Sequence, residues 1–159
     1  MAGRHLRMTA PAPASLGDWP AITALLEASG LPTSDLSPEA VPRFLVVREG
    51  ARVAGCVAVE PYGEIGLLRS LAVSQEAQGQ GLGGALVDAA LGRARALRLG
   101  RLVLLTDTAE GFFRTRGWTP VAREALPLAV RRSSEFSGSC CACAASLWRA
   151  VPAEAGRLP

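Results

Sequence analysis

The stretch that most constrains the fold is residues 67–84, with the sequence LLRSLAVSQEAQGQGLGG. Its pattern predicts an apolar strand that ends near Val73, a short polar loop, and a glycine-rich turn that opens a helix. Glycine lets backbone N–H groups converge, and the first turn of a helix carries unpaired N–H donors with a partial positive charge. Residues 78–84 therefore predict a seat for a phosphate or pyrophosphate, although a flexible helix start is the plainer interpretation.

The same turn also satisfies a rival pattern, the G-x-G-x-x-G fingerprint of dinucleotide-binding proteins, from Gly79 to Gly84. Asp107 lies about twenty residues further on, where a ribose-binding acid would be expected. Three observations count against this interpretation. Five residues separate Val73 from Gly79, the motif follows a predicted antiparallel hairpin, and little chain remains for the second half of a doubly wound sheet. A nicotinamide-dependent oxidoreductase therefore stays as an alternative from a different class.

Composition predicts a single globular domain over residues 1–159. A hydrophobic content of 49% with 19% charged residues fits a soluble protein long enough to bury a core. The sequence has no apolar run of membrane-spanning length, and its start, MAGRHLRMTAPAPA, lacks the apolar part of a secretory signal. A cytoplasmic protein without a membrane partner is expected. The net charge of +3 is spread along the chain, which suits a polyanionic cofactor better than a nucleic acid.

The four cysteines do not predict a metal site. Cys56 lies in an apolar segment and is expected in the core. Cys140, Cys141 and Cys143 have no second cluster to join, and the only histidine is His5, so no metal is expected. Three neighbouring thiols could still bind a soft metal or trivalent arsenic, and reduced thiols in a loop or strand edge are the plainer alternative.

Hydrophobic periodicity predicts an α/β chain of the α+β kind, in which three antiparallel strands precede the glycine turn and a buried parallel strand follows its helix. The predicted strands are residues 5–9, 44–47, 53–59, 65–73, 101–106, 117–121 and 145–151. Residues 11–14 are expected as a link. The first predicted helix is capped by Asp18 and ends at Gly30, and a short one follows at 37–39. A longer helix is predicted from the glycine turn to about Leu99, with Leu97 on its buried face and Gly100 at its end. A short helix at 108–114 and a helical turn within 126–132 complete the prediction.

The order of these elements and two motifs resemble the GNAT N-acetyltransferases over nearly the whole chain. The first motif is Gln78-x-x-Gly81-x-Gly83 after a strand, and the second is Ala109-x-x-Phe112-Phe113-x-x-x-Gly117-Trp118. The resemblance implies a GNAT fold: a central mixed sheet of about six to seven strands flanked by helices, with a V-shaped splay between the fourth and fifth strands.

The resemblance also implies acetyl-CoA as the co-substrate. Its pantetheine arm would pair with the backbone of the strand that precedes the turn, and an N–H in the region of Leu71 would stabilise the oxyanion. Many members of the family carry Tyr where this chain has Phe113, so either a water protonates the leaving thiolate or the thiolate leaves unprotonated. For Phe112 and Phe113, packing in the core is an equal alternative. The implied contacts with acetyl-CoA are Leu71, Ala72, Val73, Gln78, Gly79, Gln80, Gly81, Leu82, Gly83, Gly84, Phe112, Phe113 and Arg116.

Charged residues near the strand at 65–73 are the candidates for the acceptor site. Glu60 and Glu64 flank a turn and are candidate bases for an amine acceptor, although solvated turn carboxylates are the plainer alternative. Arg69 interrupts an apolar strand, and a buried guanidinium needs an anion, either on the acceptor or on one of the Glu residues. The further candidates for acceptor contacts are Tyr62, Arg43 and Arg48, with solvated strand ends as the alternative for the two arginines.

A narrower resemblance is to the arsinothricin and phosphinothricin N-acetyltransferases of arsenic-resistance operons. It rests on residues 67–73, 104–113 and 117–121 and on the tail 134–140, although that group has Cys-Pro where this chain has Cys140-Cys141. It implies detoxification by acetyl transfer to the α-amine of an amino acid with a second acidic group, which Arg69 would hold. Another small amine or a peptide N-terminus as acceptor, and a non-catalytic acyl-CoA sensor, remain alternatives. A homodimer is expected from the family.

Overall fold

The structure is a computed structural model that describes residues 8–136 and 144–152. Contacts divide the chain into two compact units. The first unit contains the chain up to Ala58 together with Ser70–Ala90, and the second contains Val59–Arg69 together with the chain from Leu91 onward. That residues 1–159 form a single domain stays a prediction.

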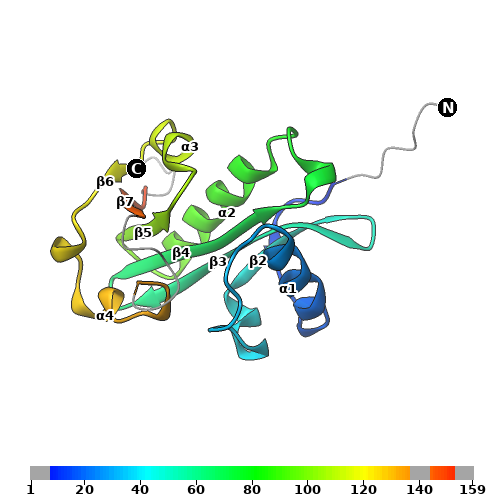
Figure 1. Cartoon of the computed structure of the whole chain (residues 1–159), viewed down its shortest axis with the longest axis horizontal. Helices are drawn as coiled ribbons and strands as arrows, with labels where there is room; N and C mark the ends of the chain where they lie inside the picture. Colours follow the sequence, from blue (N-terminus) through cyan, green and yellow to red (C-terminus); the bar gives the residue numbers. More distant parts are fainter. Residues whose placement is uncertain (1–7, 137–143, 153–159) are drawn as a thin grey trace, which may run out of the picture. The chain divides into compact units, whose positions relative to one another are not determined.

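The described elements are shown in Figure 1 in the order in which they follow along the chain. The strands are β1 (Ala12–Pro13), β2 (Phe44–Glu49), β3 (Arg52–Tyr62), β4 (Ile65–Val73), β5 (Arg101–Thr106), β6 (Thr119–Pro120) and β7 (Ala145–Ala150). The helices are α1 (Trp19–Ala28), α2 (Leu82–Ala96), α3 (Glu110–Arg114) and α4 (Leu128–Arg131), with 3-10 helices at Leu16–Asp18, Pro38–Arg43, Gln75–Ala77 and Arg123–Ala125. The strands form one mixed sheet in the order β1-β2-β3-β4-β5-β7-β6, which confirms the predicted fold class.

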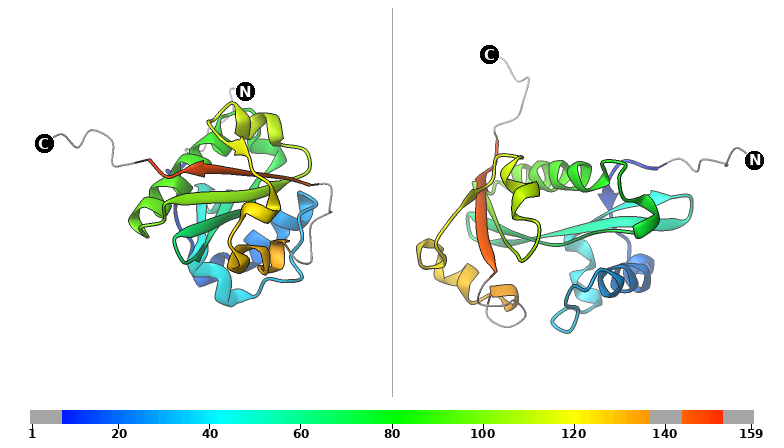
Figure 2. Two further views of the ribbon diagram at one scale, coloured as in Figure 1. Left: turned by 90° about the vertical axis from the view of Figure 1, so that its left-hand side faces the viewer. Right: turned by 45° about the horizontal axis from the view of Figure 1, so that its top comes forward.

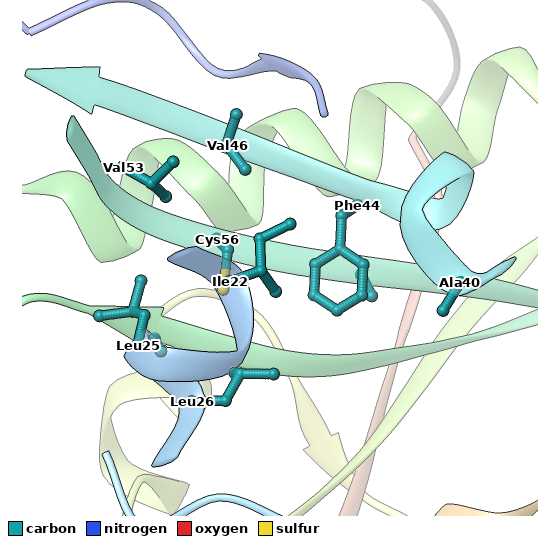
Figure 3. Packing of buried hydrophobic residues seen from close by; sticks show 10 residues of the cluster. Ile22, Leu25, Leu26, Ala40, Phe44, Val46, Val53 and Cys56 are labelled. Carbon is teal, nitrogen blue, oxygen red and sulfur yellow. The ribbon is translucent and has the colours of Figure 1, made fainter. Parts of the chain in front are cut away.

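In the first unit, α1 packs on an antiparallel arrangement of β1, β2 and the first part of β3. The β2–β3 register runs from Phe44 opposite Ala58 to Glu49 opposite Arg52. Apolar residues three and four positions apart give α1 one buried face. Figure 3 shows the side chains of this core, which include Ile22, Leu25 and Leu26 of α1, Phe44 and Val46 of β2, and Val53 and Cys56 of β3.

In the second unit, β5 is the central strand. It pairs in parallel with Ile65–Leu67 of β4 and antiparallel along its whole length with β7, and the two views of Figure 2 show β5 and β7 side by side. Strand β6 pairs with β7 at the edge of the sheet. A Cβ on Gly66 would lie 2.6 Å from Leu99 Cδ1 and 2.7 Å from Leu102 Cδ2, so any other residue here would displace the ends of both leucine side chains.

The structure corrects one prediction near the N-terminus and leaves another mostly untested. Residues 11–14, expected as a link, contain β1, which pairs with β2. The strand expected at residues 5–9 lies mostly outside the described residues, and in the part that is described Met8 forms an isolated antiparallel bridge with Glu49. The strand has only two residues, one of them Pro13, and Pro11 comes directly before it, so it gave no periodicity signal.

Helix α2 ends earlier than the sequence predicts. Arg98 adopts a left-handed φ of 62°, and its N–H donates to the carbonyl of Arg95 at 3.0 Å. The N–H of Leu99 donates to the carbonyl of Ala94 at 2.9 Å, which completes a Schellman cap. The cap leaves Leu97 43% exposed, so its prediction as a buried residue was wrong, and Leu99 is buried instead.

Candidate functional site

The glycine turn between β4 and α2 lies in the first unit and has the backbone shape of an anion seat. Gly79 and Gly81 have φ values of 84° and 81°, a left-handed region that residues with a side chain rarely adopt. A Cβ on either residue would meet no atom within 4 Å, so glycine is needed here for conformation and not for space. Left-handed residues alternating with ordinary ones turn N–H groups toward one side, and the first turn of α2 adds its unpaired N–H groups.

Hydrogen bonds hold the start of this turn and the end of the strand before it. Nε2 of Gln78 donates to the carbonyl of Val73 at 3.3 Å. The N–H of Ser74 donates to the carbonyl of Ala54 at 2.8 Å, which ties the end of β4 to β3. Residues 78–81 are exposed, so the predicted diphosphate-binding residues lie in an accessible turn and in the first residues of a helix of 15 residues.

Strand β4 has one extra residue relative to its antiparallel neighbour β3, which is a β-bulge. Gly63, with φ 69°, is the first of the two residues that join the strands, as in a type II′ hairpin, so the strand ends lie opposite each other. Counted from the hairpin, Ala54 is eight residues from the end of β3 at Tyr62. Ser74, whose N–H bonds to the carbonyl of Ala54, is nine residues from the start of β4 at Ile65, so β4 has one residue more over the same stretch. Ser70, between them, has a left-handed φ of 59°. The bulge therefore lies at Ser70, where this conformation costs about 1–2 kcal/mol.

The parallel register between β4 and β5 is short. It runs over Ile65–Leu67 and Arg101–Val103. Both strands continue beyond it, β4 to Val73 and β5 to Thr106. A register that stops while both strands continue agrees with the predicted splay between the fourth and fifth strands.

Arg69, Glu60 and Tyr62 were singled out separately in the sequence, and the structure brings them together in the second unit. The side chains of Arg69 and Glu60 are only 1% and 6% exposed, and Arg69 Nη1 lies 3.6 Å from Glu60 Oε2. The hydroxyl of Tyr62 donates to Glu60 Oε1 at 3.0 Å. A cation this deeply buried requires anionic partners, and Glu60 is one of them.

Two further residues contact Arg69, and the sequence analysis did not predict them as its partners. Arg69 Nη2 lies 3.4 Å from Oε1 of Glu135, whose side chain is 11% exposed. Arg69 Nη1 donates to Ser134 Oγ at 3.3 Å, across a separation of 65 residues along the chain. The tail around Glu135 is distinctive in the sequence, but no local pattern can pair it with a strand so far away.

The remaining acceptor candidates have different surroundings. Glu64 is exposed in the turn between β3 and β4, where its backbone carbonyl accepts a hydrogen bond from Gly100 at 2.8 Å. Arg43 is exposed at the end of a 3-10 helix in the first unit. Arg48 is partly exposed near the end of β2, and its two Nη atoms donate to both oxygens of Asp18 at 2.7 and 2.6 Å. Its role as an acceptor contact stays a prediction.

Phe112, Phe113 and Arg116 lie close together at α3 in the second unit. The ring of Phe113 is 4% exposed and meets the rings of Phe112 and Trp118 edge-on, with centroids 5.0 and 5.4 Å apart. The guanidinium carbon of Arg116 lies 4.2 Å from the centroid of Phe112. Phe113 is therefore a core residue, whereas Phe112 and Arg116 reach the surface and stay candidates for contact with a cofactor.

The cysteine and membrane predictions are tested only where the chain is described. In residues 8–136 and 144–152, no three His, Cys, Asp or Glu side chains come together as a metal site. Cys56 is buried, as predicted. Cys140, Cys141 and Cys143 lie outside the described residues, so their role stays open. In the described part of the chain no helix has the length and apolar character to cross a membrane.

The seven-stranded mixed sheet, the short parallel register between β4 and β5, and the glycine turn before α2 are the features of the N-acetyltransferase fold that the sequence resemblance implied. Residues 41–120, half of the chain, match the Acetyltransferase (GNAT) domain family. The chain belongs to this family. Membership overturns the alternative of a nicotinamide-dependent oxidoreductase.

Curated relatives of this chain are amino-acid acetyltransferases. The enzyme of Ralstonia nicotianae is 34% identical over 89 residues, which cover 55% of this chain and 20% of that protein. The enzyme of Pseudomonas putida is 35% identical over 91 residues, covering 56% of this chain and 21% of that protein. The chain thus spans about a fifth of the length of these relatives.

Solved structures extend the likeness to almost the whole chain. N-acetylglutamate synthase from Neisseria gonorrhoeae, complexed with coenzyme A and N-acetyl-glutamate, has a TM-score of 0.80 at 24% identity and covers 95% of this chain and 37% of that one. Rv2747 from Mycobacterium tuberculosis, solved in complex with CoA, has a TM-score of 0.72 at 25% identity and covers 91% and 100%. These likenesses establish a shared fold.

Proposed function

We propose that this chain is an acetyl-CoA-dependent N-acetyltransferase that acts on the α-amine of an amino acid with a second acidic group. The observation that carries the acceptor class is Arg69, a guanidinium that is 1% exposed and shared between Glu60 and Glu135. Family membership supports acetyl transfer, and the curated relatives support an amino-acid acceptor.

Acetyl-CoA would bind with its diphosphate on residues 78–84. The left-handed glycines Gly79 and Gly81 and the start of α2 support this, as do the solved relatives that contain coenzyme A. The pantetheine arm would pair with the backbone around Leu71, Ala72 and Val73. Such pairing uses main-chain N–H and C=O groups and needs no particular side chain.

The acceptor's second acidic group would bind Arg69 in place of Glu135. The Arg69 nitrogens lie 3.6 Å from Glu60 and 3.4 Å from Glu135, longer than the 2.7–2.9 Å typical of charge-assisted hydrogen bonds. A planar carboxylate, or a phosphinate or arsinate, matches the fork of a guanidinium and can approach it more closely. Glutamate is the acceptor class that the solved synthase suggests, and arsinothricin or phosphinothricin is the finer proposal that the sequence resemblance suggests.

Glu60 is the proposed base, acting directly or through a water. Tyr62 and Arg69 hold its carboxylate in place. The amine nitrogen would attack the thioester carbon in a ternary complex and form the C–N bond, which turns the carbonyl oxygen into an oxyanion, and the amine proton would pass to Glu60. The C–S bond would then break as the carbonyl re-forms and CoA leaves as the thiolate. An N–H in the region of Leu71 would stabilise the oxyanion. Phe113 has no proton to give, so the thiolate would leave unprotonated or take a proton from water.

Release of free CoA thiol, with the product identified by mass, tests the proposal. The acceptors are glutamate, phosphinothricin and arsinothricin, with glutamine as the control that matches glutamate but lacks its second charge. We expect at least one acidic acceptor to exceed glutamine about 100-fold in kcat/KM, because an ionic hydrogen-bonded contact is worth about 1.5–3 kcal/mol. Preference for a peptide N-terminus or a neutral amine would overturn the acceptor class. Acetyl-CoA binding without thiol release for any acceptor would indicate a sensor.

A further inference from the structure

The peptide between Ser70 and Leu71 lies at the bulge of β4 and has a side-chain partner on β3. Sγ of Cys56 donates to the carbonyl oxygen of Ser70 at 3.4 Å, within the range of an S–H···O hydrogen bond. Burial raises the pKa of the Cys56 thiol to about 12, although a hydrogen bond from the Ala72 backbone acts in the opposite direction. The thiol therefore keeps its proton at neutral pH and can act as a donor.

This contact determines where the N–H of Leu71 points. In a planar trans peptide the C=O and N–H groups point in opposite directions. The carbonyl of Ser70 is turned toward the sulfur of Cys56, so the N–H of Leu71 in the same peptide points away from that sulfur. Residue 71 is where the proposed mechanism needs a donor to the substrate.

We propose that Cys56 is a positioning residue whose thiol holds the Ser70 carbonyl and thereby aims the Leu71 N–H at the thioester carbonyl of acetyl-CoA. This inference rests on the proposed function, which assigns the oxyanion donor to the region of Leu71. Because Ser70 is held at a φ of 59°, the peptide tends to relax when its partner is removed. The donor would then remain present but would be misdirected.

The first test is Cys56→Ala in the full chain. Losing one oxyanion donor costs about 100- to 1,000-fold in kcat, so misdirecting a donor that stays in the chain should cost less, about tenfold. We expect KM for acetyl-CoA and for the acceptor to stay within about twofold, because the side chain touches neither in this proposal. Cys56→Ser keeps a hydrogen-bond donor, but on a shorter side chain that reaches the Ser70 carbonyl less well. Its kcat should lie between those of the wild type and Cys56→Ala.

A second measurement needs no acceptor. Acetyl-CoA labelled with ¹³C at the thioester carbonyl is bound to each protein, and the infrared carbonyl band is compared with that of free acetyl-CoA. We expect the wild type to move the band to lower wavenumber and Cys56→Ala to lose most of that shift while binding acetyl-CoA within about twofold as tightly. Val57→Ala is the matched control, because Val57 is the next residue on β3 and fully buried, and its truncation should lower Tm but keep the shift.

The outcomes separate the inference from the function beneath it. A wild-type protein that does not bind acetyl-CoA would refute the proposed function. A wild-type shift that survives in Cys56→Ala would overturn the role of Cys56 and leave the proposed function standing. An equal loss of the shift in Val57→Ala would also overturn it, because the effect would then come from general loosening of the core around β3.

Discussion

Two groups of arginine and carboxylate, one in each unit, use the same chemistry in different ways. In the first unit, Arg48 and Asp18 form a bidentate ion pair with N···O distances of 2.7 and 2.6 Å. In the second unit, Arg69 lies 3.6 Å from Glu60 and 3.4 Å from Glu135. Arg48 is paired with one carboxylate, whereas Arg69 lies near two.

The two groups also differ in exposure and in what they connect. The side chain of Arg48 is 33% exposed, and its pair with Asp18 ties the start of α1 to the end of β2. Hydrogen bonding by Arg48 lowers the pKa of Asp18 to about 2. Arg69 is almost completely buried and lies near two carboxylates, and in the proposed function the acid group of the acceptor would take the place of Glu135 beside it. The deep burial of Arg69 and its position near two carboxylates therefore make it a candidate for ligand binding, whereas the Arg48–Asp18 pair is a candidate for a structural role.

The largest expected effect concerns which of the two candidate bases, Glu60 in the Arg69 group or Glu64 outside it, takes part in the chemistry. Glu60→Gln should lower kcat about 100-fold or more, because general-base catalysis typically contributes 10²–10⁴-fold. Glu64→Gln is the control, since Glu64 is exposed in the turn next to β3 and should stay within about twofold. Steady-state release of CoA thiol at saturating acceptor measures both. If the loss appears in Glu64→Gln instead, the base has been assigned to the wrong residue.

The second effect compares the two arginines directly. Arg69→Lys should lower kcat/KM for the acidic acceptor about 30- to 100-fold, because lysine keeps the charge but loses the planar fork. KM for acetyl-CoA should stay unchanged. Arg48→Lys should leave kcat/KM within about twofold, because its pair is structural in this view. Equal losses in the two variants would remove the distinction between the groups.

The third effect is on stability and belongs to the first unit. Asp18→Asn should lower the free energy of unfolding at pH 7 by about 1–2 kcal/mol, since the pair is partly screened by solvent. The folded pKa of Asp18, about 2, is below its usual 3.8, so the stabilisation is present above pH 4 and is lost as the pH falls toward 2. Urea unfolding of both proteins across this range measures it. A difference between the two proteins that did not shrink in acid would show that the ion pair is not its source.

The smallest effect tests whether Glu135 competes with the acceptor. Glu135→Gln should lower KM for the acidic acceptor about threefold, because a larger fraction of Arg69 would then be free to bind it. Acetyl-CoA kinetics should not change, and neither should KM for glutamine, which presents no second acid. A raised KM would mean that Glu135 holds Arg69 in place for the acceptor and does not occupy its position.

Much of the fold followed from local patterns. The bounds of β4 and the position of the glycine turn could be predicted from the sequence, because an apolar stretch, a polar loop and a helix-like pattern follow one another clearly there. The bulge was not readable, because Ser70 takes a left-handed conformation that serine rarely adopts. The end of α2 was misplaced for a similar reason, since Arg98 occupies the capping position that glycine usually fills.

Only some residues of the candidate site could be predicted from the sequence. A lone arginine in an apolar strand indicated that Arg69 needs an anion, and Glu60 was close enough in sequence to be proposed. Glu135 was not predicted as its second partner, because tertiary packing alone brings it to β4 from far along the chain. Cys56 was correctly predicted as buried, but only the backbone geometry of β4 showed what its thiol touches.

Proline stands in each of the two-residue strands that border the sheet, Pro13 in β1 and Pro120 in β6. A proline cannot donate to a neighbouring ladder, so neither border is a good template for a further strand from another molecule. If the protein forms the homodimer expected from its family, pairing of two copies through these two border strands is disfavoured. The same feature should protect concentrated solutions of the protein from edge-to-edge polymerisation.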